Sequence, residues 1–143
     1  MNSSKSKPQL LSEEEIKKAP ESDYMNAEQL AFFKNRLIEL YDETNERIQD
    51  ARNQMAKPID YSDPSDRASW EEQSSIALRI VEREQKLLPK IQKSLQRIRL
   101  GTYGYCLESG EPIGIPRLLT RPTAEYCAEV KVMKERKENH YLG

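Results

Sequence analysis

Apolar side chains recur at helical spacing along the stretch that follows Asn26. Asn26 is a typical N-cap, and Gln29 three residues later strengthens that prediction. Spacings of three and four residues place one apolar stripe along a single helix. The stripe consists of Leu30, Phe33, Leu37 and Leu40 and, after a phase step, of Tyr41, Thr44, Ile48, Ala51 and Met55. Pro58 follows, so we expect this helix to stop near Lys57.

A second long helical pattern runs from about Pro64 to Leu100. Its stripe consists of Trp70, Ala77, Val81, Leu88, Ile91, Leu95 and Ile98. Two long helices joined by the short loop 58–63 must run antiparallel, and each buries its stripe against the other. An interior proline removes a hydrogen bond and clashes with the preceding turn. Pro89 therefore predicts a kink near Lys86–Pro89, or a break at which Pro89 opens a new helix.

Shorter elements flank this hairpin. Ser12 and Glu15 predict a capping box for a short helix through Lys18, which Pro20 ends, and we expect residues 1–11 to be disordered. The segment from Gly101 to Pro116 is rich in glycine and proline and fits a small ribbon of turns. Pro122 and Thr123 are expected to open a final helix that runs to about Tyr141.

These patterns divide the chain into three parts of a mainly α protein. Residues 1–25 form a partly disordered N-terminal segment that associates with the globular domain. Residues 26–100 form a long antiparallel coiled-coil hairpin, with its tip at 58–68. Residues 101–143 form a small globular domain with a C-terminal helix.

Composition narrows the function classes. Charged residues make up 33% of the chain and hydrophobic ones 36%, which suits an elongated helical protein better than one large core. The net charge of −1 gives no overall electrostatic drive toward nucleic acid. No stretch approaches the length of a membrane span. The start, MNSSKSK, lacks the apolar region of a secretory signal, and two cysteines without one indicate thiols in a reducing cytoplasm.

The two cysteines occupy half of a zinc motif. Zinc ribbons commonly carry two C-x2-C pairs about 15–20 residues apart. Here the first pair of positions holds Cys106 and Ser109, and the second holds Cys127 and Val130. Structural zinc takes four nitrogen or sulfur donors, so we expect no zinc and a domain that keeps its shape without metal. Nearby glutamates make weak structural ligands; the candidates are Glu108, Glu111, Glu125 and Glu129.

The two thiols should come close in the folded ribbon. They could pair reversibly as a redox sensor, or they could be relics that pack as small hydrophobic side chains. The second interpretation is favoured.

Two carboxylates mark the hairpin tip, where the sequence reads DPSDRA. Asp63 is a good N-cap, Pro64 suits the first helical position, and Asp66 could complete a capping box. The functional alternative is that acids at the end of a rigid arm probe another protein's site, where they would compete for a metal or for basic residues.

The motifs together resemble the DksA/TraR family of bacterial transcription factors. The matching segments span nearly the whole chain from Asp23. They are DYMNAEQLAFF, DPSDRA, REQKLL, GTYGYCLESGEPIGI and RPTAEYC. The resemblance implies a coiled-coil hairpin on a small zinc-finger domain, here a zinc-ribbon remnant. It also implies a factor that binds RNA polymerase directly, without direct DNA binding, and inserts its hairpin through the secondary channel. With the alarmone ppGpp such a factor destabilises promoter open complexes, represses ribosomal-RNA promoters and activates some amino-acid biosynthesis promoters in the stringent response.

The resemblance also implies roles for single residues. The tip residues that reach the polymerase active centre would be Asp63, Asp66 and Ala68, and the ppGpp-contacting residues would be Leu87, Lys90, Arg121 and Lys131. Guanidinium and ammonium groups suit phosphates. The missing cysteines are similar to those of zinc-independent members, and Pro89 beside Lys90 departs from the pattern.

Three other functions are less consistent with the sequence. The chain shows no nucleophile with a nearby base and no phosphate-cradling glycine loop, so an enzyme is not expected. A Gre-like factor would use its acidic tip to stimulate transcript cleavage, but the zinc-ribbon remnant argues against it. A coiled-coil structural adaptor is disfavoured by the phase step and by Pro89, and we expect a monomer.

Overall fold

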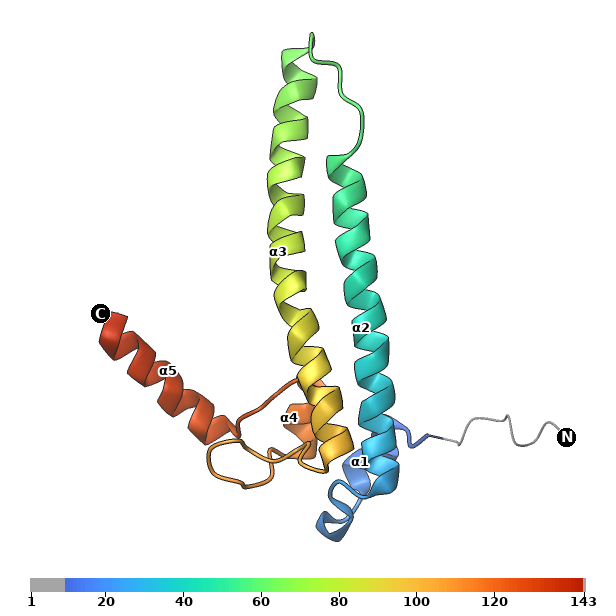
Figure 1. Cartoon of the computed structure of the whole chain (residues 1–143), viewed down its shortest axis with the longest axis vertical. Coiled ribbons are helices and arrows are strands. Elements are labelled where there is room, and N and C mark those ends of the chain that lie inside the picture. Colours follow the sequence, from blue (N-terminus) through green and yellow to red (C-terminus); the bar gives the residue numbers. More distant parts are fainter. Residues whose placement is uncertain (1–9, 143) are drawn as a thin grey trace, which may run out of the picture. The chain divides into compact units, whose positions relative to one another are not determined.

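The computed structural model describes residues 10–142, without the side chains of the last two, and this part of the chain is helical (Figure 1). Its elements are α1 (Glu13–Lys18), the 3-10 turn η2 (Glu21–Asp23), α2 (Ala27–Met55), α3 (Pro64–Leu100), α4 (Ile115–Thr120) and α5 (Ala128–Leu142). None of these helices is long and apolar enough to span a membrane. The expected disorder of residues 1–11 falls mostly outside the described residues.

The chain forms two compact units. The hairpin unit is Ile38–Lys93, and the composite unit combines the described residues of Met1–Leu37 and Ser94–Gly143. Both long helices contribute to both units.

The hairpin unit is held together by the two predicted stripes. Within it α2 and α3 run antiparallel and side by side (Figure 1). Its core consists of Ile48, Ala51, Ala77 and Val81, with Met55, Ile80 and Leu88 packed against them. A long amphipathic hairpin is therefore confirmed, and α2 ends at Met55, before Pro58 as expected.

Pro89 does not break the second helix. The alternative in which Pro89 opens a new helix is wrong, because α3 is continuous from Pro64 to Leu100. Pro89 and Gln85, whose carbonyl loses its helical partner, are both exposed, so water can solvate that carbonyl.

One polar layer interrupts the apolar seam. Thr44 is fully buried and its hydroxyl donates to the Leu40 carbonyl at 2.6 Å. The Arg47 guanidinium donates to that hydroxyl at 3.2 Å and forms an ion pair with the buried Glu84 carboxylate. A polar contact at one level of a helical pair favours a single register, because a slip would leave the charge buried without a partner.

The composite unit assembles segments that lie far apart in sequence. The predicted capping box of α1 is confirmed, with the Glu15 amide 3.1 Å from Ser12 Oγ and the Ser12 amide 2.9 Å from Glu15 Oε1. At the start of α2, the Gln29 amide donates to Asn26 Oδ1 at 2.9 Å, which confirms the predicted N-cap. The two short helices α1 and α4 pack against each other.

Aromatic residues connect the two ends of the composite unit. The Tyr24 hydroxyl donates to the Gly104 carbonyl at 2.6 Å and accepts the Gly114 amide at 2.9 Å. The rings of Phe33 and Tyr103 lie 5.6 Å apart between centroids, and both side chains are fully buried. Gly104 has a φ of +91°, which strains any residue with a side chain, and a Cβ at this position would lie 2.8 Å from the sulfur of Met25.

The final helix begins later than expected. The prediction that Pro122 and Thr123 open it is wrong, because α5 starts at Ala128. The intervening carbonyls are bound elsewhere. The Pro122 carbonyl accepts the Tyr103 hydroxyl at 2.7 Å. The Glu125 carbonyl accepts the Leu107 amide at 2.9 Å, and the Tyr126 carbonyl accepts Arg117 Nε at 2.9 Å. The short helix α4 was not predicted, and the expected ribbon is reduced, in the described residues, to a single antiparallel bridge between Tyr105 and Pro112.

Candidate functional site

The hairpin tip is organised by side-chain oxygens that accept backbone amides. Asp63 acts as the N-cap of α3, since its Oδ1 accepts the Ser65 amide at 3.0 Å. Asp66 does not complete the expected capping box with Asp63, because its Oδ2 accepts the Asp60 amide at 2.7 Å instead. Asp66 thus closes the loop onto the first turn of α3. Asp63 and Ala68 are exposed, whereas Asp66 is partly buried.

A third tip carboxylate, Asp60, was missed by the sequence prediction. Its Oδ1 accepts both the amide of Ser62, at 3.0 Å, and the Ser62 hydroxyl, at 2.6 Å. These hydrogen bonds hold the pKa of Asp60 below its ordinary value. An Asp two residues before a Ser in a turn is a recognisable pattern, which could have identified it. Among the described residues, no cluster of three or more His, Cys, Asp or Glu side chains is arranged to hold a metal ion.

Three of the four zinc-motif positions, Cys106, Ser109 and Cys127, lie close together. Both thiols are free; Cys106 is buried and Cys127 partly exposed. Ser109 Oγ lies 3.9 Å from Cys127 Sγ. Burial would raise the pKa of Cys106, but hydrogen bonds from the Ser109 hydroxyl and from the backbone of Ser109, Cys127 and Glu108 outweigh it and lower the pKa from 9.0 to about 6.

This donor set does not fit structural zinc. Structural zinc needs four nitrogen, sulfur or carboxylate donors in a tetrahedron. The four positions of the motif here hold only two thiols, together with the hydroxyl of Ser109 and the apolar Val130. Hydrogen bonds to Cys106 therefore provide the local order that a metal would otherwise provide. The Cys106 amide donates to the Glu111 carbonyl at 2.8 Å, and its carbonyl accepts the Gly110 amide at 2.9 Å.

Two of the predicted phosphate-binding residues lie together. Arg121 and Lys131 line one groove of about 530 Å³ in the composite unit. The remaining lining residues are Pro116, Arg117, Thr120, Ala128 and Glu135. Lys131 Nζ lies 3.8 Å from the Glu135 carboxylate. An exposed ion pair at this distance is weak, so the ammonium group is available to a more highly charged anion such as a phosphate.

Arg117 is a third cation in this groove, and it was not predicted. It lies one helical turn before Arg121. The Arg121 amide donates to the Arg117 carbonyl at 2.8 Å. The four-residue spacing of the two arginines is the signal that could have found it. Arg117 Nε also binds the Tyr126 carbonyl at 2.9 Å, which ties α4 to the segment that leads into α5.

Leu87 and Lys90 lie within the hairpin unit, on the part of α3 that flanks Pro89. Leu87 is partly buried, and Lys90 and Pro89 are exposed. Lys90 therefore offers an ammonium group to solvent on an unbroken helix.

Two family descriptions match the chain. Residues 29–98 match the DnaK suppressor protein DksA, N-terminal domain, and residues 101–135 match the prokaryotic dksA/traR C4-type zinc finger. The second match covers a segment in which only two of the four cysteines remain.

Full-length relatives agree with these matches. The RNA polymerase-binding transcription factor DksA of Caulobacter vibrioides is 35% identical over 130 residues, which cover 90% of this chain and 92% of that protein. The protein of the same name from Escherichia coli strain K12 is 38% identical over 135 residues, covering 91% and 87%. The solved structure of transcription factor DksA2 from Pseudomonas aeruginosa aligns with a TM-score of 0.74 at 41% identity, covering 90% of this chain and all of that one, 100%. The chain therefore belongs to the DksA/TraR family of transcription factors, as its motifs predicted.

Proposed function

We propose that this protein binds RNA polymerase through the secondary channel and, together with ppGpp, destabilises promoter open complexes. It would act in the cytoplasm as a monomer, without contacting DNA, and would repress ribosomal-RNA promoters and activate some amino-acid biosynthesis promoters during the stringent response. Relatives that cover nearly the whole chain are named RNA polymerase-binding transcription factors, which supports this proposal.

The arrangement of Asp66 is the observation that carries the proposal. One carboxylate oxygen of Asp66 holds the tip loop through the Asp60 amide, and no described residue binds the other. The same side chain can therefore fix the shape of the tip and present negative charge to a partner. Asp63 and Ala68 are exposed beside it and would contribute to the same contact at the active centre.

Transcription in vitro with purified polymerase tests the tip. Asp66→Asn keeps an oxygen that can accept the Asp60 amide but removes the charge. We expect it to fold and to bind polymerase, and to lose inhibition of a ribosomal-RNA promoter. Asp42→Asn, which changes an exposed carboxylate on α2 away from the tip, is the matched control. Full inhibition by Asp66→Asn at equal polymerase occupancy would assign Asp66 to loop structure alone, and cleavage of stalled transcripts would favour a Gre-like factor.

We propose that ppGpp is bound by Leu87, Lys90, Arg121 and Lys131 at the polymerase interface. The groove that Arg121 and Lys131 share supports half of this set. A charge-assisted hydrogen bond contributes about 1.5–3 kcal/mol, and each 1.4 kcal/mol is tenfold in affinity, so losing one contact weakens coupling about tenfold or more.

The same transcription assay tests the ppGpp site. We expect the double variant Arg121→Ala and Lys131→Ala to lose the extra inhibition that ppGpp adds and to keep the inhibition seen without it. Lys137→Ala, an exposed lysine of α5 outside the groove, is the control. Full enhancement by ppGpp in the double variant, with polymerase binding measured in parallel, would show that this site is wrong.

A further inference from the structure

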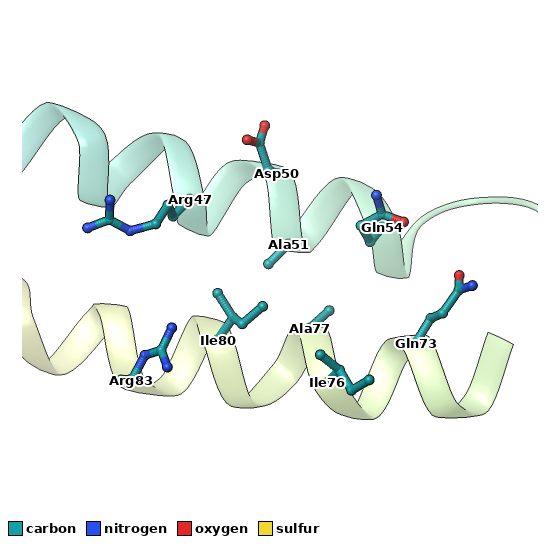
Figure 2. A pocket seen from close by; sticks show the side chains of 9 residues that line it. All are labelled: Arg47, Asp50, Ala51, Gln54, Gln73, Ile76, Ala77, Ile80 and Arg83. Carbon is teal, nitrogen blue, oxygen red and sulfur yellow. The ribbon is translucent and has the colours of Figure 1, made fainter. Parts of the chain in front are cut away.

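Each unit has a groove that carries more than one cation, and the two grooves differ in how those cations are paired. In the hairpin unit a groove of about 380 Å³ lies between α2 and α3, beside the exposed side chain of Ile76 (Figure 2). The cations at one end of it, Arg47 and Arg83, both face the Glu84 carboxylate of the same unit. In the composite unit the groove lining combines three cations with one carboxylate, that of Glu135. The groove of the composite unit is therefore the better one for an anion.

The cations of the composite unit's groove come from two helices. Arg117 lies in α4 and Arg121 is its C-cap, whereas Lys131 lies in the first turn of α5. One phosphate-rich ligand can meet the guanidinium and ammonium groups together only if α4 and α5 keep their relative position. The groove therefore depends on the contacts that fix the direction of α5.

In a zinc-binding ribbon the metal itself would join the two segments that carry the motif. These segments are the turn 106–109 and residues 127–130, where α5 begins. In this chain the Cys127 backbone hydrogen-bonds to the Cys106 thiol, and the Leu107 amide donates to the Glu125 carbonyl at 2.9 Å. Both contacts reach residues that precede α5. A helix held only at its N-terminal end can pivot about that end, so a contact farther along is needed to fix its direction.

Lys134 makes such a contact from the second turn of α5. Its ammonium nitrogen lies 3.1 Å from Glu108 Oε1 and 4.7 Å from the centroid of the Tyr126 ring. Glu108 lies inside the turn 106–109, and the Tyr126 carbonyl accepts Arg117 Nε from α4 at 2.9 Å. One ammonium group therefore connects α5 to the turn by an ion pair and, through the cation–π contact with Tyr126, to α4.

We propose that Lys134 is a positioning residue for the ppGpp site, and that its contacts with Glu108 and Tyr126 replace zinc as the link between the turn 106–109 and α5. This link holds Lys131 of α5 beside Arg121 of α4, so that both can bind one phosphate-rich ligand. Lys134 does not line the groove itself and acts through the residues that do. The inference rests on the proposed function, because it assigns no ligand of its own.

A ppGpp titration in the transcription assay, with polymerase occupancy measured in parallel, tests this role. Lys134→Glu breaks both contacts, and we expect the ppGpp concentration for half-maximal extra inhibition to rise about fivefold. Inhibition without ppGpp should persist, because the tip is unchanged. Lys137→Glu makes the same change of charge at an exposed position of α5 outside the groove. This matched control should shift the half-maximal concentration by less than about twofold.

The opposite change separates positioning from the general effect of positive charge. Glu108→Lys adds positive charge to the composite unit, so a purely electrostatic effect would strengthen the response to ppGpp. Because it places two ammonium groups side by side, we expect it instead to weaken the response about threefold. The double variant Glu108→Lys and Lys134→Glu restores an ion pair of reversed sign and should recover most of the loss. All these differences should shrink as salt concentration rises.

The aromatic contact is tested by two substitutions of Tyr126. Tyr126→Phe keeps the ring beside the Lys134 ammonium group and should respond to ppGpp within about twofold of wild type. Tyr126→Leu removes the ring and should require about threefold more ppGpp. Neither substitution removes the backbone carbonyl that binds Arg117. Circular dichroism should show an unchanged helix content in both variants.

The outcomes separate this inference from the proposed function. If ppGpp enhances inhibition by the wild type and Lys134→Glu responds like Lys137→Glu, the positioning role is overturned and the proposed function stands. A double variant that recovers nothing has the same meaning. If ppGpp does not enhance inhibition by the wild type, the inference and the ppGpp part of the proposed function both fail.

Discussion

The hairpin unit and the composite unit are stabilised in different ways. The hairpin unit repeats one kind of contact along a seam, with a single polar layer at Thr44, Arg47 and Glu84. The composite unit depends on a few individual contacts between distant segments, chiefly those of Tyr24 and Tyr103. A zinc-finger segment that lacks half of its cysteines is therefore ordered by aromatic hydroxyls and backbone hydrogen bonds. The comparison indicates that the loss of one group should have its greatest effect in the composite unit.

The largest effect is expected from Tyr103→Ala. Tyr103 is 1% exposed, contacts Phe33 and donates to Pro122, so truncation should cost about 3–5 kcal/mol of unfolding free energy. Urea unfolding followed by tyrosine near-ultraviolet circular dichroism should show the loss. The fluorescence of Trp70, which lies in the hairpin unit, should shift less. Val81→Ala changes the hairpin core instead, so it should shift the Trp70 fluorescence transition more than the tyrosine transition. Equal shifts at both probes would mean that the units unfold as one.

A smaller loss is expected from Tyr24→Phe. Removing the hydroxyl leaves the Gly104 carbonyl and the Gly114 amide without their partner, at a cost of about 1–3 kcal/mol. Burial raises the pKa of Tyr24 above 10.0, so its stabilisation is complete below pH 10 and is lost as pH rises through the folded value. Tyr61→Phe, at a side chain 71% exposed in the hairpin unit, should change nothing. Identical urea midpoints for Tyr24→Phe and wild type would show that the Tyr24 hydroxyl does not stabilise the composite unit.

A pH-dependent effect is expected from Cys106. Because hydrogen bonding lowers the pKa of this thiol to about 6, its stabilisation is complete above pH 9 and declines progressively until about pH 6. The slope is at most about 1.4 kcal/mol per pH unit. Urea midpoints between pH 5 and 9 should show this slope in wild type and in Cys127→Ser, and not in Cys106→Ser. A parallel slope in Cys106→Ser would assign it to other groups.

No effect at all is expected from a metal chelator. Since the four zinc positions supply only two thiols, chelation should leave the urea midpoint and polymerase binding unchanged. Metal analysis of protein purified without added metal is the direct measurement, and a zinc-binding four-cysteine relative treated identically is the control. Tightly bound zinc at one equivalent per chain would contradict the prediction.

The predictable parts of the fold are those that depend on neighbours in sequence. The two stripes and the caps at Ser12 and Asn26 involve residues three or four apart, so periodicity and cap preferences were sufficient. The start of α5 was not predictable in this way, because Tyr103, Leu107 and Arg117 occupy the carbonyls of 122–126 from other segments.

The same distinction applies to the candidate sites. The acidic tip could be recognised from DPSDRA, but the choice of Asp60 rather than Asp63 as partner of Asp66 depends on the path of the loop. The functional roles of Leu87, Lys90, Arg121 and Lys131 come from family resemblance alone and stay predictions. The exposed groove beside Ile76 has no sequence signal, because alanine at a seam position is equally typical of close helix packing.

The contacts of Tyr24 have a consequence for the order of folding. They join residues separated by 80 and 90 positions, so the composite unit closes a loop that contains the whole hairpin unit. Closing a loop of flexible chain carries an entropic cost that grows with its length, and a helical hairpin formed first brings its own ends together. We expect the hairpin to fold in a fast phase and the Tyr24 contacts to form afterwards, as stopped-flow Trp70 fluorescence and tyrosine circular dichroism would reveal; simultaneous phases would contradict this. A substitution that slows folding of the hairpin would then also delay the composite unit, to which the substituted residue does not belong.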